Sequence, residues 1–278
     1  MIRILSMAAL ALLLQIGSPL GAVPMIEPGA PRAMTEADMA EIVDFMVGNA
    51  VFALYHQAGH MLMQHHGAVP NDVGDAERAA DLFAVMILLD PRSGAGDQTI
   101  IDAIDSGKLS KFETLSIAAP PGDPASRPMD ITASETLICA IVGADPLGFA
   151  DIAAASQLDQ AAQRRCTAIW QRDLSAWTAA LAALPRAADP PPPWPVRYQD
   201  PAEADRAAAT ILEDNRVLEE VGGRLAKRLG LPEPPTLTAL SCGKAAARFD
   251  AAANELVFCY EDASADVHRI MRDIERRG

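Results

Sequence analysis

The chain has 278 residues, which is long enough to bury a large core, and half of them are hydrophobic while 5% are aromatic. Acidic residues outnumber basic ones 37 to 23, which gives a formal net charge of −14. Because the sequence also lacks a basic patch, we exclude nucleic acid and anionic membrane surfaces as expected partners.

The first 22 residues have the pattern of an export signal. Arg3 precedes an apolar run over 4–14, and Ala22 is a small residue suited to cleavage. This run is too short to span a bilayer, and no later run reaches the roughly 18 apolar residues of a membrane helix. We therefore expect a periplasmic or secreted protein with no stable membrane anchor after cleavage, beginning with a flexible leader over 23–34.

A long helix is expected from Thr35 to about residue 66, with Thr35 and Asp38 in a capping-box pattern at its start. Inside an apolar stretch this helix carries the pair His56 and His60. Residues four apart share one helix face, so both imidazoles can reach the same ion. The pair predicts zinc ligation, with a structural or vestigial histidine pair as the alternative.

The residue after the first histidine changes the function that this histidine pair predicts. The spacing is that of the H-E-x-x-H helix of zinc peptidases, but Gln57 stands where the general-base glutamate would be. A neutral amide can hydrogen-bond a water molecule but cannot take its proton. The same five residues therefore predict a zinc site and an impaired peptidase.

The next expected helix, from about 75 to 89, offers a third ligand. Glu77 and Asp81 form an E-x-x-x-D pattern at its start, and an antiparallel return would bring Glu77 under the imidazoles. Asp81 would then accept the second N–H of one histidine. The alternative is a solvated acidic helix start. His65 and His66, at the end of the preceding helix, are expected to be surface residues.

Further helices and a linker follow. Trp170 and Trp177 lie seven residues apart on one helix face, which favours core packing over ligand binding. Residues 114–129 are rich in Pro and Gly and predict a loop, and the proline-rich stretch over 189–200 predicts a stiff linker. The expected helices span 97–113, 131–143, 146–155 and 157–183.

Beyond the linker, the pattern predicts helical segments over 201–229, strands over 236–240 and 255–260, and a closing helix over 263–276. The predicted class is therefore mainly α with a small β-sheet (α+β). Two lobes are expected, a helical one over 35–188 and an α/β one over 201–278. The strands are expected either to lie beside the metal helix, with 256–260 as the edge strand, or to form a separate disulfide hairpin.

The four cysteines predict two disulfides, because an even count in an exported chain is typical of disulfide pairing. Three connectivities are possible. The sequential one, Cys139–Cys166 with Cys242–Cys259, keeps each pair on its own side of the linker and is preferred. A cysteine metal site is disfavoured because no C-x-x-C spacing is present.

Residues 48–62 read GNAVFALYHQAGHML, and residues 76–84 read AERAADLFA. These segments resemble the metallopeptidase family DUF4344, whose members carry GNALFVLxHELGHALI and EEDAADQLA segments. The likeness continues through CAIVGADP at 139–146, CGKAAARFD at 242–250 and LVFCYE at 256–261.

The resemblance implies a gluzincin-like, zincin-type fold with His56, His60 and Glu77 as zinc ligands. The chain departs from the family twice. Gln57 replaces the general base, and Ala125-Ser126-Arg127 stands where members carry Asp-Glu-His. Losing both groups predicts a degenerate site.

Three functions remain open from the sequence. The leading one is an exported, zinc-binding, metallopeptidase-like protein with little or no hydrolytic activity that binds peptides or proteins. The second is an active zinc metallopeptidase in which another carboxylate, Asp81 or Glu261, serves as the base. The third is a metal-free interaction protein on a zincin scaffold.

Overall fold

The computed structural model describes residues 33–70, 76–117, 131–184, 189–244 and 247–277. The expected export signal over 1–22 and the Ala125–Arg127 segment lie outside the described residues. The described chain is mainly helical with one small sheet, which confirms the α+β class. Its α-helices are α1 (Glu36–Gln64), α2 (Ala76–Leu89), α3 (Gly94–Ile117), α4 (Ile131–Ala144), α5 (Ala150–Ala155), α6 (Gln160–Ala182), α7 (Arg206–Asp214), α8 (Val217–Leu229) and α9 (Tyr260–Arg277).

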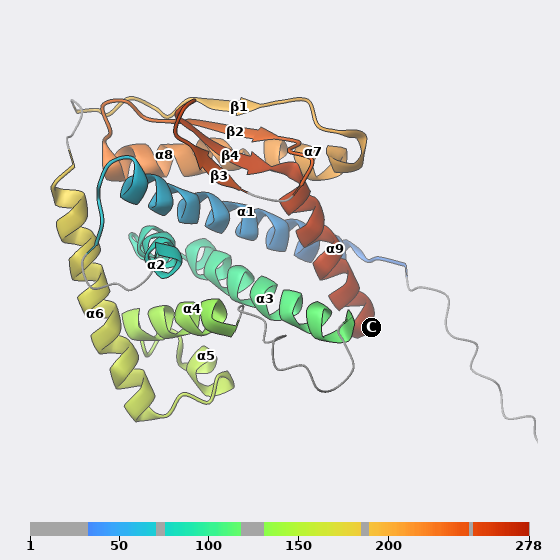
Figure 1. The fold of residues 1–278 in the computed structure, drawn as a ribbon. Coiled ribbons are helices and arrows are strands. Elements are labelled where there is room, and N and C mark those ends of the chain that lie inside the picture. Colours follow the sequence, from blue (N-terminus) through green and yellow to red (C-terminus); the bar gives the residue numbers. More distant parts are fainter. Residues whose placement is uncertain (1–32, 71–75, 118–130, 185–188, 245–246, 278) are drawn as a thin grey trace, which may run out of the picture. The chain divides into compact units, whose positions relative to one another are not determined.

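Helix α1 is the central element of the fold. Its start is fixed by the expected capping box, in which the Thr35 hydroxyl accepts the Asp38 N–H at 3.1 Å and the Asp38 carboxylate accepts the Thr35 N–H at 2.8 Å. Figure 1 shows α1 between a layer formed by the sheet with α8 and a layer formed by α2 and α3. Both sides of this helix are therefore covered, and the histidine pair sits in the middle layer of the molecule.

The sheet has four strands, β1 (Val196–Tyr198), β2 (Thr236–Leu240), β3 (Arg248–Asp250) and β4 (Glu255–Cys259), in the order β1-β2-β4-β3. β1, β2 and β4 are parallel, and β3 pairs antiparallel with β4. The expectation that 256–260 forms an edge strand is wrong. Residues 248–250 pair with β4 on its outer side, so β4 is internal and the edges are β1 and β3.

The segments expected as separate lobes share one hydrophobic core. Buried residues of α1, α2, α4 and α6 belong to the same cluster as buried residues of α8, β2 and β4. Residues 34–278 accordingly form one compact unit, in which the linker region supplies the edge strand β1. Trp170 and Trp177 are both buried in this core, which confirms their packing role. The sheet therefore lies beside α1, the helix that carries the histidine pair, rather than in a separate hairpin.

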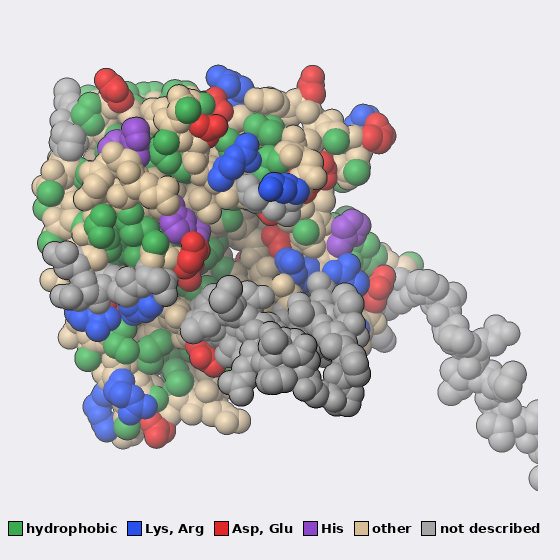
Figure 2. All heavy atoms as spheres, viewed as in Figure 1, with side chains coloured by type: hydrophobic (Ala, Val, Ile, Leu, Met, Phe, Trp, Pro, Cys, Tyr) green, Lys and Arg blue, Asp and Glu red, His purple; other side chains and the backbone are tan. Residues whose placement is uncertain are grey.

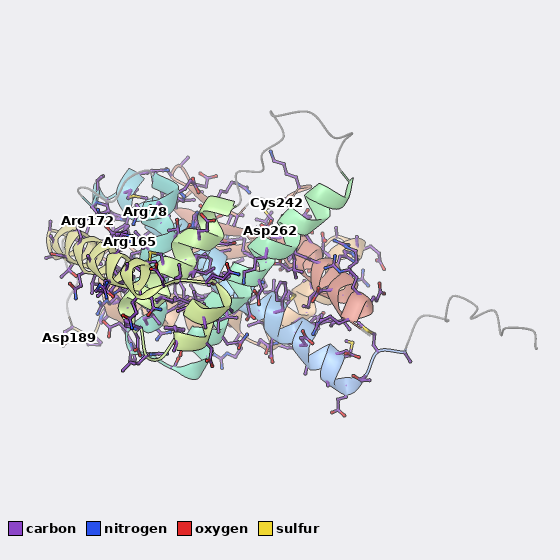
Figure 3. The ribbon with its side chains drawn as sticks, turned by 90° about the horizontal axis from the view of Figure 1, so that it is seen from below. Arg78, Arg165, Arg172, Asp189, Cys242 and Asp262 are labelled. Carbon is purple, nitrogen blue, oxygen red and sulfur yellow. A yellow bond between two sulfur atoms is a disulfide. The ribbon has the colours of Figure 1, made fainter. Side chains whose placement is uncertain are left out.

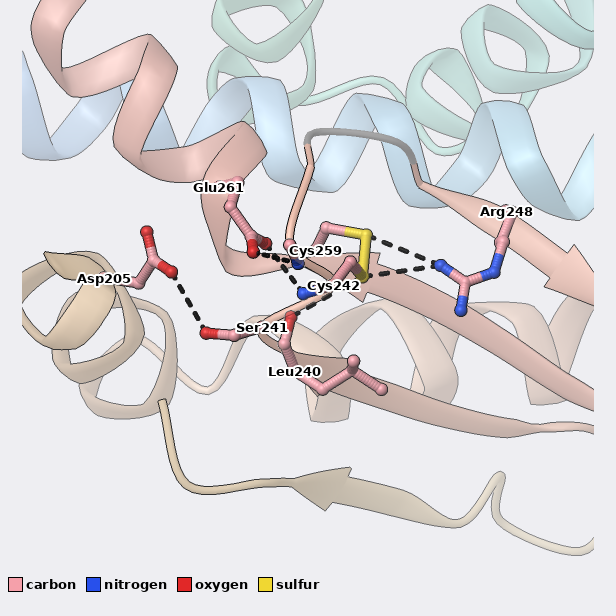
Figure 4. Close-up of a disulfide and its surroundings, with 8 residues drawn as sticks. Asp205, Leu240, Ser241, Cys242, Arg248, Cys259 and Glu261 are labelled. Carbon is pink, nitrogen blue, oxygen red and sulfur yellow. Dashed lines mark hydrogen bonds between the residues drawn. A yellow bond between two sulfur atoms is a disulfide. The ribbon is translucent and has the colours of Figure 1, made fainter. Parts of the chain in front are cut away.

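Both expected disulfides are present, Cys139–Cys166 between α4 and α6 and Cys242–Cys259 at the ends of β2 and β4. The surroundings of the second are shown in Figure 4. The Glu261 carboxylate accepts the backbone N–H groups of Cys242 and Gly243 at 3.0 and 2.6 Å, and the Arg248 guanidinium lies 3.4 and 3.6 Å from the two sulfurs. This end of the sheet is thus closed by covalent and hydrogen bonds.

Candidate metal centre

The two helices that carry the candidate ligands approach each other closely at Gly59. A Cβ atom at this position would lie 2.9 Å from the Cα of Ala80, closer than real Cβ contacts allow. Glycine between the two histidines therefore lets the first turns of α2 pack directly on α1. The result is that Glu77, at the start of α2, faces the His56 and His60 side chains on α1.

His56, His60 and Glu77 come together as one group of potential metal ligands. The two Nε2 atoms lie 3.1 Å apart. Oε2 of Glu77 lies 3.3 Å from Nε2 of His56, and Oε1 of Glu77 lies 3.3 Å from Nε2 of His60. Both imidazoles are mostly buried, whereas the Glu77 side chain is 75% exposed. The group therefore opens to solvent on the side of the carboxylate.

These distances fit a tetrahedral zinc ion. With metal–ligand bonds of about 2.0–2.1 Å, the edges of a tetrahedron measure about 3.3–3.4 Å. The Nε2–Nε2 separation of 3.1 Å is close to one such edge, and each Nε2 atom has a different Glu77 oxygen 3.3 Å away. Two imidazole nitrogens and one carboxylate oxygen are also a ligand set that zinc prefers, with a fourth position left for water.

The protonation of His56 also suits a ligand. Its Nδ1 lies 2.8 Å from Oδ1 of Asp81, which is buried on α2 one turn after Glu77. A carboxylate only accepts hydrogen bonds, so Nδ1 carries the proton and the Nε2 lone pair faces the site. Asp81 therefore fixes both the tautomer and the orientation of this ring.

His60 is held in the neutral form that binds metals. Burial lowers the pKa of this imidazole, and the neighbouring His56 lowers it further, while Glu77 and Asp81 raise it. Its Nδ1 atom is buried and has no hydrogen-bond partner among the described residues. Nε2 is the nitrogen of this ring that faces the other two candidate ligands.

The other residues singled out by sequence take different positions. His65 is exposed, as expected for the end of α1, and its ring lies edge-on to Phe249 with centroids 5.5 Å apart. His66 is half-buried, and burial lowers its pKa. Gln57 is half-buried directly after the first candidate ligand. Arg127 lies outside the described residues.

The two carboxylates considered as substitute bases already accept hydrogen bonds from other groups. Oδ1 of Asp81 contacts Nδ1 of His56, the ring atom that faces away from Nε2. Both oxygens of Glu261 accept backbone N–H groups beside the Cys242–Cys259 disulfide. Cys242, Cys259 and Glu261 also lie close enough together to suggest a second metal group, but their sulfurs are bonded to each other.

Comparison with known protein families identifies the family of this chain. The model of the DUF4344 family, described as "Putative metallopeptidase", matches residues 30–181. The chain belongs to this family. The match contains all three candidate ligands of the DUF4344 member, but it ends before β1, so the sheet and helices α7–α9 lie beyond it. No curated protein and no solved structure matches the chain.

No helix among the described residues is long and apolar enough to cross a membrane. On the face shown in Figure 2, acidic and basic side chains are interspersed, and histidine side chains reach the surface.

Proposed function

We propose that this DUF4344 member is an exported, zincin-like protein that binds zinc through His56, His60 and Glu77 and has little or no peptidase activity. One observation carries the proposal, namely that the two Nε2 atoms lie 3.1 Å apart and that each of them has an oxygen of Glu77 3.3 Å away. The Nδ1 contact of His56 with Asp81 supports it, because it leaves the Nε2 lone pair directed at the group.

Gln57 is the reason for impaired catalysis. Zinc held in such a site supplies Lewis acidity toward a water molecule or a carbonyl oxygen. Peptide hydrolysis additionally needs a side chain that takes the proton of the attacking water, and general-base catalysis is typically worth about 10²–10⁴-fold in rate. The Gln57 amide hydrogen-bonds water but accepts no proton, so the protein retains binding without efficient turnover.

An active enzyme with a substitute base is the weaker candidate. It would need Asp81 or Glu261 to release its present contacts and reach the metal-bound face of the imidazoles. The hydrogen bonds to the His56 ring and to the backbone at Cys242 and Gly243 disfavour this. Peptides or proteins are the partners we propose for the inactive site, and the two disulfides support an oxidising compartment, periplasmic or secreted.

Gln57→Glu tests this proposal. The wild-type protein should bind zinc and fail to cleave unstructured peptides above background, whereas Gln57→Glu should gain chelator-sensitive hydrolysis of up to about 10²–10⁴-fold. We expect a gain below the upper limit, because Arg127 stands where the family's histidine would assist. Gln64→Glu, on the same helix, is the matched control and should stay inactive. Chelator-sensitive hydrolysis by the wild type would overturn the impaired-site proposal.

A further inference from the structure

Glu77 lies in the first turn of its helix, a part that needs contacts with other elements to stay ordered. It is the second residue of α2, and the N–H groups of a first turn have no partners within the helix, so helix ends tend to fray. Its side chain is 75% exposed, which leaves little packing to hold the carboxylate. A metal ligand must nevertheless be placed within about 0.5 Å. Some other contact must therefore fix the first turn of α2.

Helix α6 supplies such contacts to the first turns of α2. Asp173, which is 1% exposed, accepts a hydrogen bond from Nη2 of Arg78 at 2.5 Å, and Arg78 directly follows Glu77. The other Asp173 oxygen accepts from Nε of Arg172 at 2.8 Å, so both oxygens of this carboxylate are used. Figure 3 shows Arg78 and Arg172 close together beside α6. Because hydrogen bonds to buried charges are strong, Arg78 is held firmly.

A second contact from the same face of α6 reinforces the first. Trp177 lies one turn after Asp173, and its indole N–H donates to the carbonyl oxygen of Ala79 at 3.0 Å. Its ring also packs against Phe83 with centroids 5.0 Å apart. The first turns of α2 are thus held by hydrogen bonds from α6 and also pack closely on Gly59 of α1.

We infer that Asp173 is a positioning residue for the metal centre: it holds Arg78 and thereby fixes the helical turn from which Glu77 reaches the imidazoles. This inference rests on the proposed zinc site. Trp177 acts in the same way through the Ala79 carbonyl. Neither residue is placed to touch the metal, and both act on the third ligand through the backbone of α2.

Zinc affinity, measured by competition with a chromophoric chelator, tests the inference independently of turnover. Asp173→Asn should weaken zinc binding by about 10–100-fold, the range typical of groups that support a ligand. Trp177→Phe keeps the ring against Phe83 and should cause a smaller loss. Asp266→Asn is the matched control, because Asp266 is a buried carboxylate that accepts from Arg269 and from Ser106 on α3. It should leave zinc affinity unchanged.

A double-mutant cycle separates positioning from general destabilisation. In a Glu77→Ala background, Asp173→Asn should cause no further loss of zinc affinity, since the residue it positions is gone. An equal loss in both backgrounds, or an unchanged affinity of Asp173→Asn, would overturn the inference. If Asp173→Asn does not fold, the same cycle with Trp177→Phe decides. A wild-type protein that binds no zinc would instead overturn the proposed function.

Discussion

Among the residues that the structure describes, two clusters each bring three potential metal ligands within 4.8 Å of one another, and they differ in what already occupies the ligand atoms. In the first, His56, His60 and Glu77 contact one another with no covalent link, and the Nε2 lone pair of His56 is turned inward. In the second, Cys242 and Cys259 form a disulfide, and the nearby Glu261 caps backbone N–H groups.

The comparison shows that potential ligand atoms can lie close together without being able to bind a metal ion. Thiolates bind zinc, but sulfurs joined in a disulfide present no thiolate, so the second cluster stabilises the end of the sheet. The imidazoles and the carboxylate of the first cluster have no covalent link, and burial lowers the pKa of His60, which favours the neutral form that binds metals. Each cluster can therefore be broken separately, and each break should affect a different property of the protein.

The largest expected effect comes from removing an imidazole of the open cluster. His60→Ala should weaken zinc binding by more than about 100-fold, because loss of a ligand exceeds the 10–100-fold typical of supporting residues. Chelator competition measures this affinity. His65→Ala, an exposed histidine of the same helix end, is the control and should bind zinc like the wild type. Equal zinc affinities of the His60→Ala and His65→Ala variants would show that the first cluster is not a metal centre.

A smaller effect, on stability alone, is expected from opening the closed cluster. The combined substitutions Cys242→Ser and Cys259→Ser free a loop whose ends are 17 residues apart, which should lower the free energy of unfolding by about 3 kcal/mol. Urea denaturation measures the loss. Zinc affinity of the folded variant should remain that of the wild type, and a parallel fall in affinity would show that the two clusters are coupled.

The sequence predicted the open cluster because its pattern is local. His56 and His60 are one helical turn apart, and the helix periodicity on both sides is strong, so the shared face follows from spacing. Glu77 and Asp81 begin the next helix, and a short connection leaves few ways for it to return. The cysteine pairs were also predictable, since the proline-rich stretch separates them in the chain.

What the sequence could not predict depends on distant contacts. β1 and β3 are three residues each, too short for an alternating pattern, and they are strands only because β2 and β4 pair with them. The main core is shared because α1 packs against elements from both sides of the linker. Arg78 and Asp173 are 95 residues apart, and no local sequence pattern predicts their contact.

The smallest expected effect tests how the open cluster keeps its lone pairs directed inward. Asp81→Asn preserves the shape of the side chain but replaces the carboxylate that accepts the Nδ1 proton of His56, so the ring loses its fixed tautomer. Zinc affinity should fall by about tenfold, the lower end of the range for supporting residues, because the amide oxygen can still accept one hydrogen bond. Asp90→Asn, just after the end of the same helix and paired with Arg228, makes the same chemical change away from the imidazoles and should have no effect. If both variants bind zinc as tightly as the wild type, the orientation of His56 must come from packing, and availability of the lone pair would not depend on Asp81.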